Sequence, residues 1–179
     1  PNDKTNFVHK ASYTTNQLVS LSANDAEEIF YDFGEIGRLM GENYTNLYDT
    51  IFENWCNYND FTHNIDNAQS LYGSFTNTYP YPLLWLSAGL TGWVQKILPN
   101  YHGRVEVRYG RNFSANNVSI LLDGVTLDTT NELDKTVTFS FKPNQVLKVQ
   151  ENSTSVMVIY HIKITKTSSY GINEEKRPN

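Results

Sequence analysis

The sequence contains almost no cysteine and no long apolar segment. Cys56 is the single cysteine among 179 residues, so no disulfide can form within the chain. No apolar run approaches the length that spans a bilayer, and we expect no membrane insertion. The chain must therefore be stabilised by burying its own apolar side chains, and its length suffices for one domain with a sizeable core.

The sequence also lacks an excess of positive charge. It has 14 basic and 19 acidic residues, scattered along the chain, for a net charge of -5. Proteins that bind nucleic acid concentrate Lys and Arg on one face or along one helix. We therefore expect no nucleic-acid partner.

Motifs for catalysis or metal binding are missing as well. The histidines are dispersed without ligand spacing: His9, His63, His102 and His161. Cys56 lies in an apolar-leaning segment, which favours an inert buried thiol over a nucleophile. No glycine-rich phosphate loop occurs, and no pair of carboxylates has the context of a glycosidase. The sequence predicts no catalytic residue, no metal and no cofactor.

The second half of the chain alternates apolar and polar residues. Val105, Val107 and Tyr109 alternate with charged residues, which is the period of a strand with one buried face. Residues 117–128 predict a β-hairpin, because Asp123-Gly124 supplies the positive φ angles of a type I′ turn. Further strands are predicted at 92–98, 137–141, 146–149 and 156–164.

These strands leave no room for helical crossovers, so the sheets must be antiparallel. Turn signals follow one another every eight to twelve residues or so, which is typical of a sandwich or jelly roll. The predicted fold class is mainly β: an antiparallel β-sandwich (jelly roll) with an N-terminal helical elaboration.

The helical elaboration is predicted from two segments. Asn24 and Glu27 have the spacing of a capping box, and helical periodicity continues to Met40, before Gly41. A second helix is predicted over residues 47–58. Residues 59–87 show no clear period, and we expect loops there with one or two short strands.

We divide the chain into four parts by these patterns. Residues 1–22 form an N-terminal extension, 23–87 the helical and loop elaboration, 88–165 the sandwich core, and 166–179 a polar tail. Within the extension, residues 6–21 have a β-favouring composition and could lend a strand to an adjacent subunit. We expect both ends to be held by neighbouring copies.

A dense aromatic run lies between residues 72 and 85. Its members are Tyr72, Phe75, Tyr79, Tyr81 and Trp85. Aromatic faces stack on sugars while the polar edges of Tyr and Trp form hydrogen bonds, so Tyr72, Tyr79, Tyr81 and Trp85 are candidate carbohydrate-binding residues. The alternative is that the run covers one open side of the sandwich. Trp55 and Trp93 are assigned to the core.

Four sequons occur, at Asn43, Asn112, Asn117 and Asn152. Their number is near what this composition gives by chance. Asn112, Asn117 and Asn152 lie at predicted strand ends or turns, where a glycan could be carried. All four are candidate glycosylation sites.

Short motifs in the second half resemble a known module. They are Trp93, residues 104–110, residues 122–125, residues 145–151 and residues 158–162. In this order they resemble a jelly-roll module, similar to concanavalin and carbohydrate modules, of surface proteins of large viruses and algae. The resemblance covers about residues 88–165, and it implies a non-enzymatic sandwich used in surface structures and adhesion.

The sequence thus predicts a structural subunit of an extracellular or virion-surface assembly, such as a fibre or shell. It would associate with other copies of itself through β edges and termini, and it could carry or contact glycans. The alternative is a carbohydrate-binding or adhesion module.

Overall fold

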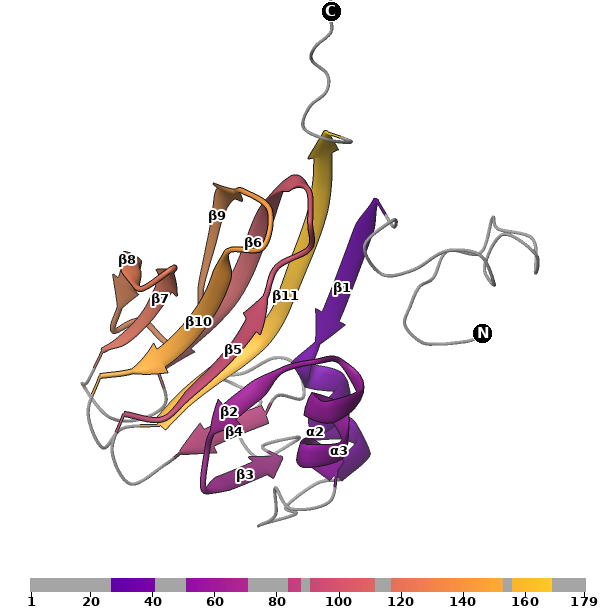
Figure 1. The fold of residues 1–179 in the computed structure, drawn as a ribbon. Helices are drawn as coiled ribbons and strands as arrows, with labels where there is room; N and C mark the ends of the chain where they lie inside the picture. Colours follow the sequence, from indigo (N-terminus) through magenta and orange to yellow (C-terminus); the bar gives the residue numbers. More distant parts are fainter. Residues whose placement is uncertain are drawn as a thin grey trace, which may run out of the picture.

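The computed structural model describes residues 27–40, 51–70, 84–87, 91–111, 117–152 and 156–168, which form two antiparallel sheets packed face to face (Figure 1). The six-stranded sheet contains β1 (Glu28–Asp32), β3 (Asn67–Ser70), β4 (Leu84–Ser87), β6 (His102–Arg111), β9 (Lys135–Phe141) and β11 (Val156–Ser168). Its order is β3-β4-β11-β6-β9, and β1 also pairs with β11. The five-stranded sheet contains β2 (Thr62–Asn64), β5 (Trp93–Ile97), β7 (Val118–Leu122), β8 (Val125–Thr130) and β10 (Val146–Glu151), in the order β2-β5-β10-β7-β8. The predicted β-sandwich is confirmed.

The predicted hairpin is present as β7 and β8. Asp123 and Gly124 have φ angles of 50° and 80°, as a type I′ turn requires at both central positions. The Asp123 carboxylate accepts a hydrogen bond from the backbone N–H of Val146 at 2.8 Å. The turn is therefore fastened to β10, the strand beside β7.

The start of the first helix was predicted wrongly. Residues 28–32 form β1, which pairs with β11 and places Ile29 opposite Ile164. Helix α2 (Phe33–Met40) begins only afterwards, and the Asp32 carboxylate caps it by accepting hydrogen bonds from Gly34 N and Glu35 N at 2.9 and 3.2 Å. Pairing with an open edge of β11 outweighs the local capping signal at Asn24, since each paired residue gains ladder hydrogen bonds and cross-strand packing.

The second predicted helix is present as α3 (Ile51–Tyr58), while residues 47–50 lie outside the described part of the chain. Residues 59–87 contribute three strands, β2, β3 and β4, where one or two were expected. Their short lengths explain why no sequence period revealed them. Neither described helix is long or apolar enough to cross a membrane.

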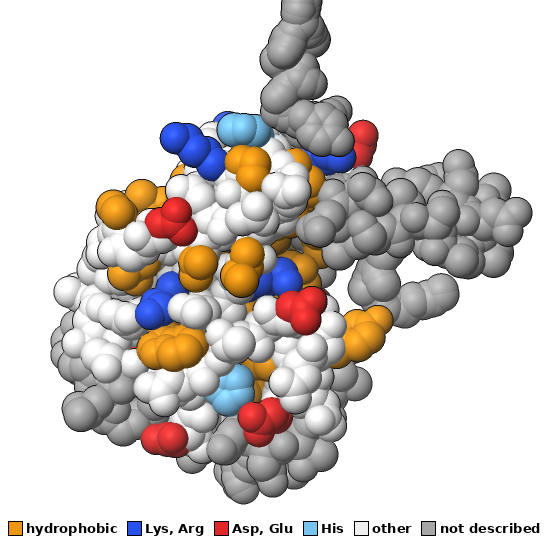
Figure 2. Space-filling model, viewed as in Figure 1, with side chains coloured by type: hydrophobic (Ala, Val, Ile, Leu, Met, Phe, Trp, Pro, Cys, Tyr) orange, Lys and Arg blue, Asp and Glu red, His pale blue; other side chains and the backbone are white. Residues whose placement is uncertain are grey.

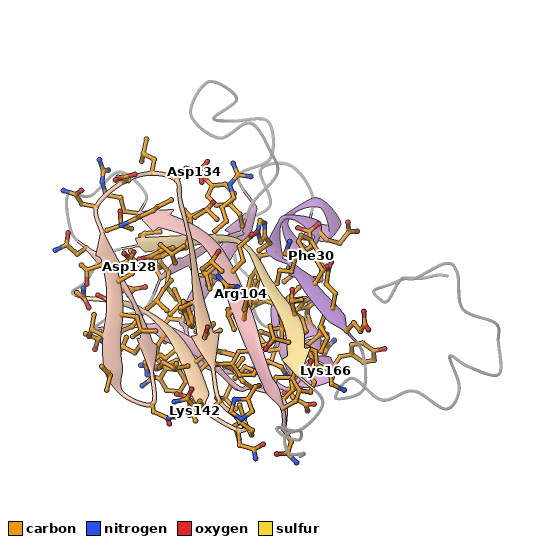
Figure 3. The ribbon with its side chains drawn as sticks, turned by 90° about the horizontal axis from the view of Figure 1, so that it is seen from above. Phe30, Arg104, Asp128, Asp134, Lys142 and Lys166 are labelled. Carbon is orange, nitrogen blue, oxygen red and sulfur yellow. The ribbon has the colours of Figure 1, made fainter. Side chains whose placement is uncertain are left out.

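The core joins side chains from both sheets and both helices. On β11, Ile159 and Ile162 face the sandwich interior, opposite Tyr109 and Val107 of β6. Val158 and Tyr160 are also buried, although they alternate with Ile159. Both faces of this strand are therefore covered. Figure 3 shows the interior filled by side chains from both layers.

Candidate functional site

The outer face of the five-stranded sheet carries two rows of side chains that cross all five strands. The alternate residues on these strands, such as Val94 and Val149, are buried in the core. Residues between them therefore point away from the core. The first row is Asn64, Trp93, Gln150, Ser119 and Thr129; the second is Thr62, Gln95, Lys148, Leu121 and Thr126. We call these ten residues the Trp93 face.

Trp93 lies on this face, between Asn64 of β2 and Gln150 of β10, rather than in the core. Its side chain is half-buried, and the ammonium group of Lys148 lies 4.8 Å from the centre of its ring. The two residues are diagonal neighbours, because Trp93 pairs with Gln150 and Lys148 pairs with Gln95. The prediction that Trp93 belongs to the core was wrong. Its alternation with the buried Val94 was the signal that could have placed it outside.

Hydrogen bonds order the polar end of the face. Ser119 Oγ and Thr129 Oγ1 are 2.8 Å apart, and Asn152 Nδ2 donates to Ser119 Oγ at 2.8 Å. Asn152 N also donates to the carbonyl oxygen of Asn117 at 3.0 Å. The hydroxyl and amide groups are thereby held in fixed positions before any ligand arrives, which lowers the entropic cost of binding.

Beyond the second row of the Trp93 face, the surface of the sheet is apolar. Ile97 of β5 pairs with Val146 of β10, and Ile97 is 64% exposed. Figure 2 looks onto this side of the molecule and shows hydrophobic side chains spaced among uncharged ones. Such a mixture of apolar contacts and fixed polar groups suits a ligand that has both kinds of surface.

The outer face of the six-stranded sheet is different, because it carries several ion pairs. Arg108 binds Asp134 with both ends of its guanidinium, at 2.9 and 2.6 Å, and its charge lies over the ring of Tyr160 at 4.6 Å. His161 Nε2 lies 2.8 Å from Glu106 Oε2. Opposite charges on this face are largely satisfied by one another, so it offers fewer groups to a ligand.

A buried aromatic cluster lies where α3 meets the sandwich. Tyr31, Phe33, Trp55 and Phe61 contact one another at ring distances of 4.8 to 6.2 Å. Lys96 enters this cluster from β5, and its Nζ donates to the carbonyl oxygen of Asn59 at 2.7 Å. Burial lowers the pKa of Lys96 although Asp60 acts in the opposite direction. Lys96 thus attaches the end of α3 to the five-stranded sheet.

The described residues do not bring together a set of metal ligands. No three His, Cys, Asp or Glu side chains among them lie close enough to hold a metal ion. Cys56 is buried, as predicted, and burial raises the pKa of its thiol to about 12 with a smaller contribution from Glu53. The thiolate is therefore disfavoured at neutral pH.

The predicted carbohydrate-binding residues are only partly covered by the structure. Tyr72, Tyr79 and Tyr81 lie outside the described residues. The backbone of Trp85 is part of β4, opposite Val158 and Gln69, but its side chain is not described. Their role in binding stays a prediction.

Two of the four sequon asparagines are described. Asn117 and Asn152 are exposed and lie side by side at the ends of β7 and β10, in agreement with their expected placement. Asn43 and Asn112 lie outside the described residues. Whether any of the four carries a glycan stays a prediction.

Comparison with known proteins gives weak structural similarities. No protein-family model matches the chain, and no curated protein matches it in sequence. Among solved structures, the chain is similar to a family 35 carbohydrate-binding module from Clostridium thermocellum, with a TM-score of 0.43 and 10% identity over 79% of this chain and 100% of that one.

The module CBM35 from Paenibacillus barcinonensis gives a TM-score of 0.41 and 16% identity over 60% of this chain and 93% of that one. The module CBM36, in complex with calcium and xylotriose, gives a TM-score of 0.38 and 17% identity over 59% of this chain and 94% of that one. These solved structures are carbohydrate-binding modules, the kind of module that the sequence resembles. At TM-scores below 0.5, the similarity carries no ligand and no binding residue over to this chain.

Proposed function

We propose that this protein binds carbohydrate on the Trp93 face. The observation that carries this proposal is the position of Trp93 between the amide side chains of Asn64 and Gln150, on a face where Lys148 is the single charged group of the ten. An indole ring stacks on the C–H surface of a sugar, and Asn, Gln, Ser and Thr side chains donate to and accept from its hydroxyl groups. A face of mixed ion pairs would not supply this combination.

The shape of the face favours an extended ligand. Neighbouring strands lie about 4.8 Å apart, so a row across five strands is roughly 19 Å long. That length accommodates several sugar units laid across the strands. We therefore expect an internal stretch of a polysaccharide to bind rather than a single sugar. Such ligands are met outside cells or at virion surfaces, so the predicted location remains part of the proposal.

Replacing Trp93 by alanine tests the proposal. We expect the dissociation constant to rise roughly thirtyfold, or about 2 kcal/mol, because the aromatic contact is lost. Affinity electrophoresis against a panel of soluble plant, algal and microbial polysaccharides, followed by titration calorimetry, would measure the change. The matched control is Phe30→Ala, which removes another exposed aromatic ring from β1 of the other sheet.

Two results would change or contradict this assignment, and one control checks the fold of the variants. Binding that survives Trp93→Ala but is lost in Tyr79→Ala would move the site to the predicted aromatic run. A wild-type chain that binds nothing in the panel would contradict the proposal. Unfolding curves of the two variants show whether a loss of binding reflects a loss of fold.

A second candidate function is self-association, which the sequence predicted for a structural subunit. One observation favours it: β8 is an edge strand of its sheet, and Val125 and Leu127 on it are 62% and 45% exposed. An unpaired edge with apolar side chains is a template for pairing with another strand. Of the termini that were expected to take part, residues 1–22 and 169–179 lie outside the described residues, and residues 166–168 of the predicted tail belong to β11.

Mass measurement by light scattering after gel filtration tests self-association. We expect a mass above the 20.5 kDa of one chain, and a return to 20.5 kDa in Leu127→Lys, since an edge lysine opposes pairing. Thr138→Lys, at an exposed position of β9, is the control. A wild-type mass of 20.5 kDa at every concentration would exclude this function.

A further inference from the structure

Lys148 is the one charged side chain among the ten residues of the Trp93 face. It lies on β10, the middle strand of the five, with Gln95 and Leu121 as its cross-strand neighbours. Neither neighbour can neutralise an ammonium group. The Trp93 ring beside it supplies only a cation–π contact, which leaves the positive charge in place.

Acidic groups at the turn beside this face and on the other sheet have partners of their own. The Asp123 carboxylate, at the turn between β7 and β8, accepts from Val146 N at 2.8 Å and from Gln145 Nε2 at 3.3 Å. Glu106 and Asp134 lie with their basic partners on the six-stranded sheet. Although the chain has a net charge of -5, the Trp93 face itself is uncharged except for one cation.

We infer that the Trp93 face selects polysaccharides that carry carboxylate or sulfate groups, and that Lys148 determines this selectivity. The inference rests on the proposed carbohydrate binding. The Lys148 ammonium is 4.8 Å from the centre of the Trp93 ring, so an anionic substituent of a sugar in contact with Trp93 comes within its reach. A charge-assisted hydrogen bond from the ammonium to such a substituent would replace or supplement the cation–π contact.

Matched polymers separate this selectivity from binding in general. Carboxymethyl cellulose and hydroxyethyl cellulose share a backbone and differ in charge, and dextran sulfate and dextran form a second pair. We expect the wild-type chain to bind the anionic member of at least one pair about tenfold more tightly. The preference should shrink in 1 M salt, where the Debye length falls to about 3 Å.

Two substitutions test the role of Lys148. Lys148→Met keeps the length of the apolar stem and removes the charge, so the preference for the anionic member should disappear. Lys148→Arg keeps the charge and should retain a preference. Lys142→Met, at an exposed lysine outside the two rows, is the control for a change in net charge.

Equal binding of both members of each pair, or no binding of any of the four polymers, would overturn the inference. A preference that persists in Lys148→Met would also overturn it. If a neutral polysaccharide from the larger panel is bound and that binding is lost in Trp93→Ala, the proposed function stands although the selectivity fails. If the wild type shows the tenfold preference and Trp93→Ala loses all binding, the results would support both the proposed function and the selectivity.

Discussion

Gly110→Ala is expected to lower the free energy of unfolding by about 3 kcal/mol, because the added methyl group has no space. A Cβ atom at this position on β6 would lie 2.1 Å from the carbonyl oxygen of Leu133 and 2.8 Å from that of Glu132. These neighbours are backbone atoms and cannot rotate away. They belong to the connection that carries the chain from β8 to β9, and so from one sheet to the other.

The clash would also disturb the pairing of this connection with β6. Arg111 N donates to the carbonyl oxygen of Glu132 at 2.9 Å, and the Tyr160 hydroxyl donates to that of Leu133 at 3.3 Å. Moving the connection outward therefore weakens hydrogen bonds to two strands. Chemical denaturation followed by tryptophan fluorescence would measure the change.

Gly124→Ala is the matched control for Gly110→Ala. Gly124 has no atoms within 4 Å of the Cβ position, but its φ angle is +80°. Alanine there suffers backbone strain alone, of about 1 kcal/mol. If Gly110→Ala is no less stable than Gly124→Ala, the close approach of residues 132–133 to β6 is contradicted.

Alkaline pH is expected to destabilise the protein steeply, since three buried acidic groups are neutral in the folded state. Burial raises the pKa of Tyr31, and burial together with the Asp128 carboxylate raises the pKa of Tyr109. Burial also raises the pKa of Cys56 to about 12. A group whose pKa is raised by folding stabilises the folded state fully at pH values below the pKa that it has in the unfolded chain. This stabilisation is lost as the pH rises above that unfolded pKa.

The expected pH window follows from the unfolded values. The stability that Cys56 contributes begins to fall near pH 9, and the stability that Tyr31 and Tyr109 contribute begins to fall near pH 10. Each group then removes about 1.4 kcal/mol per pH unit, or about 4 kcal/mol per unit for the three together. Lys96 has the opposite effect, because its pKa is lowered in the folded state. Between that lowered pKa and its ordinary value of 10.5, its contribution to the free energy of unfolding rises with pH. Above pH 10.5 it no longer opposes the loss of stability from the other three groups.

Denaturation curves recorded from pH 7 to pH 11.5 would test this expectation. Tyr31→Phe should make the decline above pH 10 shallower by about 1.4 kcal/mol per unit, whereas Tyr58→Phe is the control, since Tyr58 is 85% exposed. The absorbance of ionised tyrosine should show that Tyr31 and Tyr109 titrate only as the chain unfolds. A stability profile that stays flat to pH 11.5 would contradict the burial of these groups.

Features with a local physical cause could be predicted from the sequence. The Asp123-Gly124 turn was predicted because few residues adopt positive φ, and separate strands were predicted at 137–141 and 146–149. The structure confirms both, with Asn144 at a φ of 63°. Cys56 was placed in a buried site because it follows apolar residues at helical spacing.

Features that depend on distant partners were missed. Residues 28–32 satisfy the helical pattern equally well, and only the free edge of β11 makes them a strand. Trp93 was assigned to the core because large aromatic residues are usually buried. Its position outside depends on which face of β5 meets the other sheet.

The sequence by itself determined the class of fold and the β6 to β11 series of strands, since alternation and turn residues act within a few positions of the chain. It also showed that the chain has no long apolar segment and no glycine-rich phosphate loop. Only the tertiary structure decided that Asn64, Trp93, Gln150, Ser119 and Thr129 form one row, because strand register joins residues from five separate segments. The candidate binding face is therefore a product of pairing between distant strands, which no local pattern specifies.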